Sequence, residues 1–341
     1  MRRLRSGTTI VELLVALGVV SLLLSGTMPA IQSLRERSRR MECENRLRQI
    51  GVAIHGYESA HRHFPMAGEM PYEENGQLFP RSHAPHLYLA PFLGATAVFD
   101  SANRTCAADR GLWYDPPMSD PNYAVRNTRL SLFLCPSDPN SEHGRNSYRA
   151  NLGLISFPRG NSVRQPSYKA HIGPFMPVSQ WPTFQAVTDG LSNTVAFSER
   201  SIGDGDLRQY TSDTDIFYVG EVIDPNLLVQ SSTVDDSYTS ACSQLRIPDP
   251  QHDSSAGEFW LYGGLTDTWY NHLLSPNSSI PDCGTSAGMF GSGVVAARSR
   301  HNAGVNVLVM DGSCRFVNET VSKNVWQQIG TRSGGETESW Q

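Results

Sequence analysis

The feature that most constrains this chain is an uncharged apolar run near its N-terminus, from Leu13 to Ile31. Its length approaches the roughly 20 residues that cross a bilayer as a helix. Three arginines, at positions 2, 3 and 5, precede the run as in the basic front of an export signal. Glu12 stands at its start, although a charge in lipid costs several kcal/mol unless a partner neutralises it. The fold therefore has to give this acid a partner.

Three interpretations of the run are open. A cleaved secretory signal needs a small-x-small site after the run, and the tripeptides at 25–27 and 28–30 match that site poorly. A plain membrane anchor fits the length but leaves Glu12 without a partner. A helix that packs against copies of itself supplies one, because the free amino terminus of a neighbouring chain neutralises the carboxylate.

The residues around Glu12 resemble the type IV prepilin signal, in which a peptidase cuts after a glycine and the fifth residue of the mature chain is glutamate. On this resemblance Gly7 ends a leader of residues 1–7, and Thr8 becomes the first mature residue and the site of N-methylation. Glu12 is then the fifth residue and forms an assembly salt bridge with a neighbour's amine. Pro29 stands where pilins tend to carry a helix-kinking proline. Thr8 departs from the phenylalanine usual in the family, which bears on methylation rather than on cutting.

After the apolar run the helix is expected to continue through residues 35–63. Glutamate and arginine four positions apart support a solvated helix by a few tenths of a kcal/mol per pair, and the pairs are Glu36–Arg40, Glu42–Arg46 and Glu44–Arg48. Apolar side chains then recur at alternating steps of four and three, which places them on one face. These residues are Cys43, Leu47, Ile50, Ile54, Tyr57 and His61. The face predicts packing on a globular part, with His61 as a core histidine.

The predicted domains are therefore a transmembrane helix over 8–31, its amphipathic continuation over 32–64 and a globular head over 65–341. Pro65 ends the helix or breaks it just before that residue. The head is rich in glycine and proline, which favours short strands and long loops.

Several stretches of the head predict particular elements. "LSLFLCPSDP", "TVAFSER" and "DIFYVGEV" are typical of strands because they are rich in apolar, β-branched and aromatic residues. Asp311-Gly312 stands between two valine-containing runs and predicts a two-residue hairpin turn within 305–317. A short helix is expected over 320–329, with Thr320 as its cap.

The six cysteines are scattered and lack the paired spacing of a zinc site, so no metal is predicted at them. They are Cys43, Cys106, Cys135, Cys242, Cys283 and Cys314. An even number in a loop-rich body suits disulfides in an oxidising compartment, while buried thiols remain the alternative. Three bridges pair in 15 ways, among which the sequence does not choose. The acidic turns "TDGLSNT" and "GDGDL" could hold calcium, although neither has the ligand spacing of an EF-hand. No other cofactor is expected.

The residues give no pattern of an enzyme or of a nucleic-acid binder. A net charge of −5 does not favour nucleic acid as a partner. His301, Asp311 and Ser299 suggest a nucleophilic triad only by residue type, because the serine has no G-x-S-x-G elbow. The stretch "ESAHRH" is not H-E-x-x-H.

A second resemblance covers nearly the whole chain. "SRHNAGVNVLVMDGSCRFVNETVSKNVWQQIGTRSGGE" is similar to the ending of a large bacterial family of prepilin-like proteins with a domain of unknown function, in which a histidine, nine residues and then Asp-Gly recur. His301, Asp311 and Gly312 fit that motif. Ala303 stands where a second glycine is common, and Cys314 where an aliphatic residue is usual. Other matching stretches are "RMECENRLRQIGVAIHGY", "LSLFLCPSDP", "SYRANLG", "TDGLSNTVAFSER" and "PDCGTS".

The resemblance implies an α+β, pilin-like fold related to the pseudopilins of type II secretion, with a long N-terminal helix packed on an antiparallel β-sheet head that carries large loop insertions. The expected function is that of a structural subunit in a type IV pilus or a type II secretion-like assembly. Its expected partners are a prepilin peptidase, other pilin-like subunits or itself, and the membrane. The expected location is the inner membrane, crossed once, with the head in the periplasm or at the cell surface. The alternative is a monomeric, membrane-anchored extracytoplasmic binding protein that does not polymerise.

Overall fold

A computed structural model places the residues from Thr9 to Gly335 in segments. Gly7 and Thr8, the predicted cleavage and methylation site, lie outside the described residues. The described residues are 9–65, 72–74, 77–79, 83–106, 108, 120–155, 171–175, 182–219, 237–245, 251–285 and 292–335.

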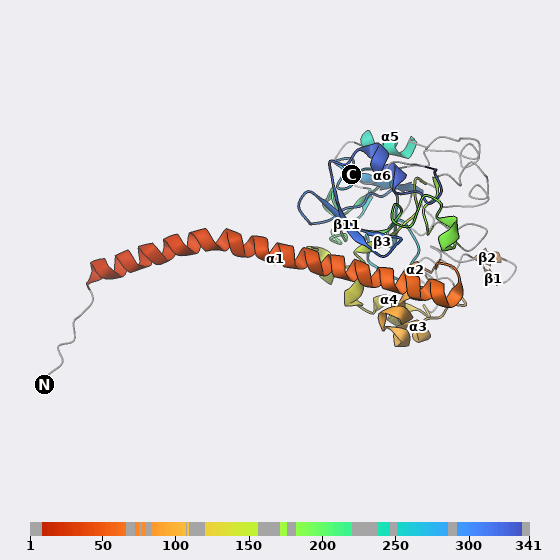
Figure 1. Cartoon of the computed structure of the whole chain (residues 1–341), viewed down its shortest axis with the longest axis horizontal. Helices are drawn as coiled ribbons and strands as arrows, with labels where there is room; N and C mark the ends of the chain where they lie inside the picture. The colour runs from red at the N-terminus through yellow and green to blue at the C-terminus, as the bar shows by residue number, and fades with distance from the viewer. Residues whose placement is uncertain are drawn as a thin grey trace.

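The chain begins with one helix, α1 (Ile10–His61), of 52 residues and about 78 Å at 1.5 Å per residue. A capping box starts it: Glu12 N–H donates to Thr9 Oγ1 at 3.3 Å, and Thr9 N–H donates to Glu12 Oε2 at 2.9 Å. Glu12 thus has a hydrogen-bond donor within its own chain. Pro29 lies inside α1, which Figure 1 shows as curved but continuous. The helix ends where Arg62 adopts a left-handed conformation, at φ 66°.

The N-terminal half of α1 projects away from the head (Figure 1). Large apolar side chains on this half are exposed, and they include Ile10, Val11, Leu13, Leu14, Val15, Leu17, Val19, Val20, Leu22, Met28 and Ile31. Among the residues that the structure describes, no helix is both long enough and apolar enough to cross a membrane, and the transmembrane segment expected over 8–31 is not confirmed.

The second half of α1 packs on the head through the predicted apolar stripe. Cys43, Leu47 and Ile50 have no exposed surface, and Ile54 is 2% exposed. The prediction that His61 is a core histidine is wrong, because its side chain is exposed and its ring stacks on that of Tyr57 with centroids 4.1 Å apart. His61 is the last residue of α1, where the helix reaches the edge of the head.

The central sheet of the head has five strands in the order β11-β10-β4-β3-β7. Its neighbours are antiparallel except for the parallel pair β3–β7. The strands are β3 (Tyr148–Asn151), β4 (Val195–Glu199), β7 (Trp269–Tyr270), β10 (Gly304–Val309) and β11 (Cys314–Asn318). The α+β class with an N-terminal helix agrees with the sequence, and β4 coincides with the predicted strand "TVAFSER".

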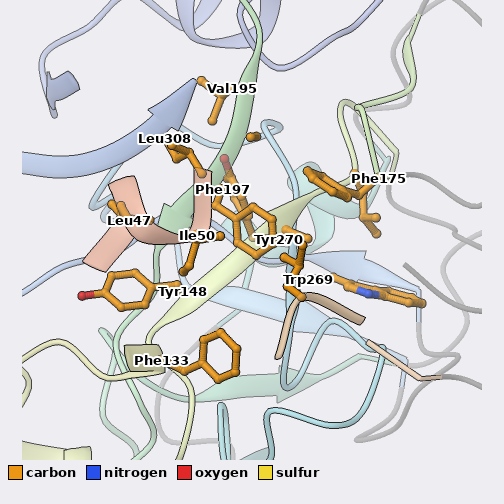
Figure 2. Packing of buried hydrophobic residues seen from close by; sticks show 14 of the residues in the cluster. Leu47, Ile50, Phe133, Tyr148, Phe175, Val195, Phe197, Trp269, Tyr270 and Leu308 are labelled. Atoms are coloured by element: carbon orange, nitrogen blue, oxygen red, sulfur yellow. The ribbon is translucent and has the colours of Figure 1, made fainter. Parts of the chain in front are cut away.

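The core lies between α1 and this sheet. Figure 2 shows Leu47 and Ile50 of α1 beside Leu308, Phe197 and Tyr148, which come from β10, β4 and β3. Burying an aliphatic side chain of this size stabilises the fold by about 1.5–3 kcal/mol. The apolar stripe therefore determines which face of α1 meets the head, and with it the direction of every other α1 side chain in this region.

A second sheet has four strands in the order β6-β5-β8-β9 and contributes side chains to a second, smaller core. Its strands are β5 (Ile216–Tyr218), β6 (His252–Asp253), β8 (Asp282–Gly284) and β9 (Gly293–Val294). The other elements within the described segments are a pair of short strands, five short helices and four 3₁₀ turns. They are β1 (Tyr72–Glu74) and β2 (Gln77–Phe79), α2 (Pro85–Leu89), α3 (Thr96–Ser101), α4 (Tyr123–Asn127), α5 (Ser237–Ser243) and α6 (Lys323–Gln328), and η1 (Ala90–Leu93), η2 (Ser131–Phe133), η3 (Pro139–Glu142) and η6 (Phe184–Ala186).

Two local predictions differ from the structure. "LSLFLCPSDP" forms the turn η2 instead of a strand, because Ser147 N–H and an Arg46 guanidinium N–H bond to its carbonyls in place of a neighbouring strand. Thr320 does not cap α6. Ser322 does, since its hydroxyl accepts the N–H of Val325.

The turn between β10 and β11 is longer than the two residues predicted. Val309 N–H donates to Ser313 O at 2.8 Å and Gly312 N–H donates to Val309 O at 2.9 Å, which leaves a three-residue loop. Gly312 has φ 85°, whereas Asp311 is not among the residues with positive φ. This is a turn closed by a left-handed glycine, the common three-residue hairpin loop. Asp311 Oδ1 accepts the N–H and hydroxyl of Ser313 and so holds the loop.

Candidate functional site: the junction of the first helix and the head

His301 lies where α1 meets the head, just before β10. Its side chain is 1% exposed, with Nδ1 2.7 Å from Glu36 Oε1 and Nε2 3.1 Å from Glu199 Oε1. Ala303 follows with φ 66°, a left-handed conformation that turns the chain into β10. The motif histidine therefore contacts the first helix and the central sheet with its two nitrogens.

Glu36 reaches the junction from α1. Its carboxylate also accepts the Ser137 hydroxyl at 3.0 Å. The predicted Glu36–Arg40 pair is not formed, because the Arg40 guanidinium lies over the Phe316 ring at 3.4 Å from its centroid. The tertiary contacts of Glu36 and Arg40 replace a helix-surface pair worth only a few tenths of a kcal/mol.

Glu199 supplies the second carboxylate from the end of β4. It is 2% exposed and accepts the N–H of Asn306 at 2.8 Å and its Nδ2 at 3.0 Å. Asn306 belongs to the neighbouring strand β10, so the sheet itself orients the acid. Together with His301, these donors account for the burial of a charge that would otherwise be costly.

A disulfide joins α1 to the same place. Cys43 bonds to Cys135, and Cys135 Sγ lies 3.6 Å from His301 Nε2 and 3.9 Å from Glu199 Oε1. We call Cys43, Cys135, Glu199 and His301 the junction cluster. One nitrogen, oxygen or sulfur atom of each lies within 4.8 Å of the others, and all four residues are buried. The sequence predicted no metal at the cysteines, because residues this far apart have no ligand spacing to detect.

The second disulfide, Cys242–Cys283, joins α5 to β8. The two bridges use four of the six cysteines that were candidates for pairing. Cys106 is buried, and Cys314 is partly buried with Sγ 3.5 Å from Glu44 O. Burial raises the pKa of the Cys314 thiol to about 12.

The two carboxylates affect the charge of His301. Burial by itself lowers the pKa of a histidine. The hydrogen bonds and negative charges of Glu199 and Glu36 outweigh burial here and raise the pKa of His301 above its ordinary value of 6.5. The imidazolium form is therefore favoured in the folded chain, as a cation held between two acids.

Three further buried charged residues lie beside the junction cluster. Arg200 follows Glu199, and its NH2 lies 2.8 Å from Asp282 Oδ2. Arg298 NH2 lies 2.9 Å from Asp282 Oδ1, and Arg298 N–H donates to Glu199 O. Burial raises the pKa of Asp282, but the two guanidinium groups outweigh it and hold that pKa below its ordinary value. We call these residues the arginine–aspartate triad; they connect β8 of the smaller sheet to β4.

The structure does not bring together the histidine and the aspartate of the His-X9-Asp-Gly motif. His301 precedes β10 and Asp311 follows it, so a six-residue strand of about 20 Å separates them. Ser299 donates its hydroxyl to Gly304 O and accepts the N–H of His301, which makes it part of the turn. Gly312 instead faces α1, since a Cβ on Gly51 would lie 3.2 Å from Gly312 Cα.

The two acidic turns considered for calcium use their carboxylates to hold backbone. Asp189 accepts the N–H groups of Gly334 and Gly335 at 2.7 and 2.9 Å. Asp204 accepts the N–H of Asp206 at 2.9 Å and the hydroxyl of Thr211 at 2.7 Å. Asp189 thus binds a segment near the C-terminus, whereas Asp204 has donors from its own loop.

Sequence reasoning identified His301 and the cysteines but missed Glu36, Glu199 and the arginine–aspartate triad as site residues. A usable signal was present, because the stretches quoted for the family resemblance converge at the junction. "RMECENRLRQIGVAIHGY" supplies Cys43, "LSLFLCPSDP" supplies Cys135 and "TDGLSNTVAFSER" supplies Glu199. Motifs that are distant along the chain meet in one cluster.

A comparison with protein families finds a match that covers all of these stretches. No curated protein matches the chain, and no solved structure does. One family model matches residues 32–324, which reach from the start of the head-contacting half of α1 to α6 and include the whole junction. The chain belongs to that family, which is described as proteins of unknown function (DUF1559, SBP_bac_10).

Proposed function

We propose that this chain is a structural, pilin-like subunit that a prepilin peptidase cuts after Gly7. The apolar half of α1 would hold the subunit in the inner membrane. Through the same half it would assemble with other pilin-like subunits or with copies of itself. The head would stand in the periplasm or at the cell surface. The role is structural rather than catalytic. Family membership and the α+β architecture are consistent with this proposal.

The observation that carries the proposal is the exposed apolar half of α1, which projects from a folded head (Figure 1). Each large aliphatic side chain moved from water to an apolar environment contributes about 1.5–3 kcal/mol. A contiguous apolar surface of this size marks a contact with protein or membrane. Lipid before assembly and neighbouring helices afterwards supply such contacts.

Glu12 distinguishes an assembling subunit from a plain membrane anchor. Its side chain stands among exposed apolar residues and accepts the N–H of Thr9 through Oε2. A carboxylate in an apolar environment costs several kcal/mol, and one backbone donor does not neutralise it. The amine that cleavage would create on Thr8 of a neighbouring chain supplies the missing charge.

The first test is the mass and N-terminal sequence of the mature protein, made in a bacterium that has a prepilin peptidase. We expect a chain that starts at Thr8, with or without a methyl group. A chain that keeps its arginines, or that starts near residue 30, would overturn the proposal.

The second test separates the charge of Glu12 from its capping role. Glu12→Gln removes the charge and keeps a hydrogen-bond acceptor for the N–H of Thr9. Thr9→Val removes the hydroxyl that accepts the N–H of Glu12 and keeps the charge. We expect Glu12→Gln to stay in the membrane but to be depleted from filaments sheared from the cells, and Thr9→Val to be incorporated. Equal incorporation of wild type and Glu12→Gln would remove the assembly role, and a wild-type protein found only in membranes would favour the non-polymerising binding protein.

A further inference from the structure

We propose that, when the Cys43–Cys135 bond is reduced, the junction cluster binds a thiophilic divalent cation such as zinc through both thiolates, His301 Nε2 and Glu199 Oε1. This site is independent of the proposed assembly role. It would fasten α1 to the head in the reduced chain as the disulfide does in the oxidised one.

The distances between the donor atoms fit a tetrahedral site. With bonds of about 2.3 Å to sulfur and 2.0–2.2 Å to nitrogen and oxygen, tetrahedral geometry places sulfur about 3.6 Å from nitrogen or oxygen, and nitrogen about 3.4 Å from oxygen. Cys135 Sγ lies 3.6 Å from His301 Nε2 and 3.9 Å from Glu199 Oε1. His301 Nε2 lies 3.1 Å from Glu199 Oε1. Cys43 Sγ lies within 4.8 Å of the other donor atoms. Once the disulfide is broken, the two sulfurs must separate to about 3.8 Å, and Cys43 Sγ must settle about 3.6 Å from the nitrogen and the oxygen.

The surrounding hydrogen bonds suit metal ligands. A ligating histidine usually donates its other N–H to a carboxylate, which fixes the tautomer and the ring orientation. Glu36 Oε1 is 2.7 Å from His301 Nδ1 and can accept that proton, which leaves Nε2 with a lone pair toward the cluster. Asn306 holds Glu199 with two donors from β10. Both ligands are therefore oriented by partners outside the four donor residues.

The chemistry balances with a dithiol as reductant. The dithiol gives two electrons and two protons to the Cys43–Cys135 bond, which becomes two thiols, and is itself oxidised to a disulfide. Binding of Zn²⁺ then releases the two thiol protons to solvent, and a third proton when His301 is imidazolium. Zinc binding is therefore expected to weaken as the pH falls.

The test uses the full chain in detergent, reduced by a dithiol under anaerobic conditions and freed of the reductant. We expect one zinc ion per chain in competition with a chromophoric chelator, and no such binding by the oxidised wild type, which lacks the two thiolates of the junction cluster. Co²⁺ in place of zinc should give thiolate charge-transfer bands and the absorption of a tetrahedral ion.

Three variants make the assignment specific. The double variant Cys43→Ser/Cys135→Ser should abolish the thiolate bands. Glu36→Gln, which alters a half-exposed positioning residue, should lower the zinc affinity about 10- to 100-fold. Cys314→Ser is the matched control, because this thiol lies outside the cluster, and it should bind zinc as wild type does. Reduced wild type that binds no more zinc than the oxidised protein would overturn the proposal. Equal affinities of wild type and Glu36→Gln, or loss of zinc in Cys314→Ser, would also contradict it.

Discussion

His301 and Glu36 are separated by 265 positions in the sequence, yet His301 Nδ1 and Glu36 Oε1 lie 2.7 Å apart. This contact joins the residue before β10 to the first helix. The other ring nitrogen meets Glu199 of β4, so a single side chain connects α1 to two strands of the central sheet. The stability of the contact between helix and head is therefore linked to the ionisation of one histidine.

This linkage predicts a pH-dependent stability. Because the pKa of His301 is raised in the folded state, its charged contacts contribute fully below the ordinary value of 6.5 and are lost as pH rises through the folded-state pKa. His301→Gln cannot be charged, so it should be destabilised most at low pH, by about 1.5–3 kcal/mol as for a charged hydrogen bond. Denaturant unfolding from about pH 5.5 to about pH 9 measures the difference from wild type. A difference that stays constant over this range would show that His301 acts by packing alone.

The arginine–aspartate triad predicts a large loss of stability when one carboxylate oxygen of Asp282 is replaced by an amide nitrogen. Asp282→Asn leaves two buried guanidinium groups facing a neutral amide, which should cost about 3–5 kcal/mol in the free energy of unfolding. Asp213→Asn is the control, because that aspartate is half-exposed and pairs with Arg300 at 3.5 Å, and it should change stability by less than about 1 kcal/mol. Chemical denaturation of both variants gives the comparison. Similar losses would mean that the buried pair contributes no more than the surface pair.

The two disulfides should stabilise the chain unequally. Cys43–Cys135 closes a loop of 92 positions and Cys242–Cys283 one of 41, so the first restricts the unfolded chain more. Loop-closure entropy predicts that losing the first costs about 0.7 kcal/mol more than losing the second. The double variants Cys43→Ala/Cys135→Ala and Cys242→Ala/Cys283→Ala test this by denaturant unfolding under oxidising conditions. The reverse order of stability would contradict loop length as the dominant cause.

The turn after His301 predicts a stabilising substitution. Ala303 has φ 66°, which costs a non-glycine residue about 1–2 kcal/mol, while glycine gives back about 0.4–1 kcal/mol through the entropy of the unfolded chain. Ala303→Gly should therefore raise the free energy of unfolding by about 0.5–1 kcal/mol. Ala102→Gly is the control, because Ala102 has φ −75°, and it should be destabilised. If both variants lose stability, the left-handed conformation is not the cause.

Local patterns in the sequence were sufficient for local elements. The steps of four and three from Cys43 to Tyr57 place one face of a helix in the core, since side-chain direction in a helix depends only on spacing. Asp311-Gly312 between two runs of strand-forming residues indicates a hairpin, and β10 and β11 pair as one. The exact loop was missed, because its length depends on which backbone groups bond across it.

The junction depended on tertiary structure. Nothing in the spacing of Glu36, Glu199 and His301 indicates that they meet. The pairing of four of the six cysteines likewise depends on which segments pack together, at the junction for one bridge and between α5 and β8 for the other. Arg40 shows the reason. Its local partner Glu36 offers a few tenths of a kcal/mol. Instead, the Arg40 guanidinium lies over the Phe316 ring of β11, and the Glu36 carboxylate is bound by Ser137 and His301 of the head.

The sequence by itself determined that an N-terminal helix has one apolar face followed by a strand-rich head, because repeated short-range spacings carry that information. Only the tertiary structure decided which side chains that face brings together. Packing α1 on the central sheet fixes the rotation of the helix, and this rotation brings Cys43 and Glu36 to His301. Contacts across such distances depend on the sum of many small burial energies rather than on any single motif.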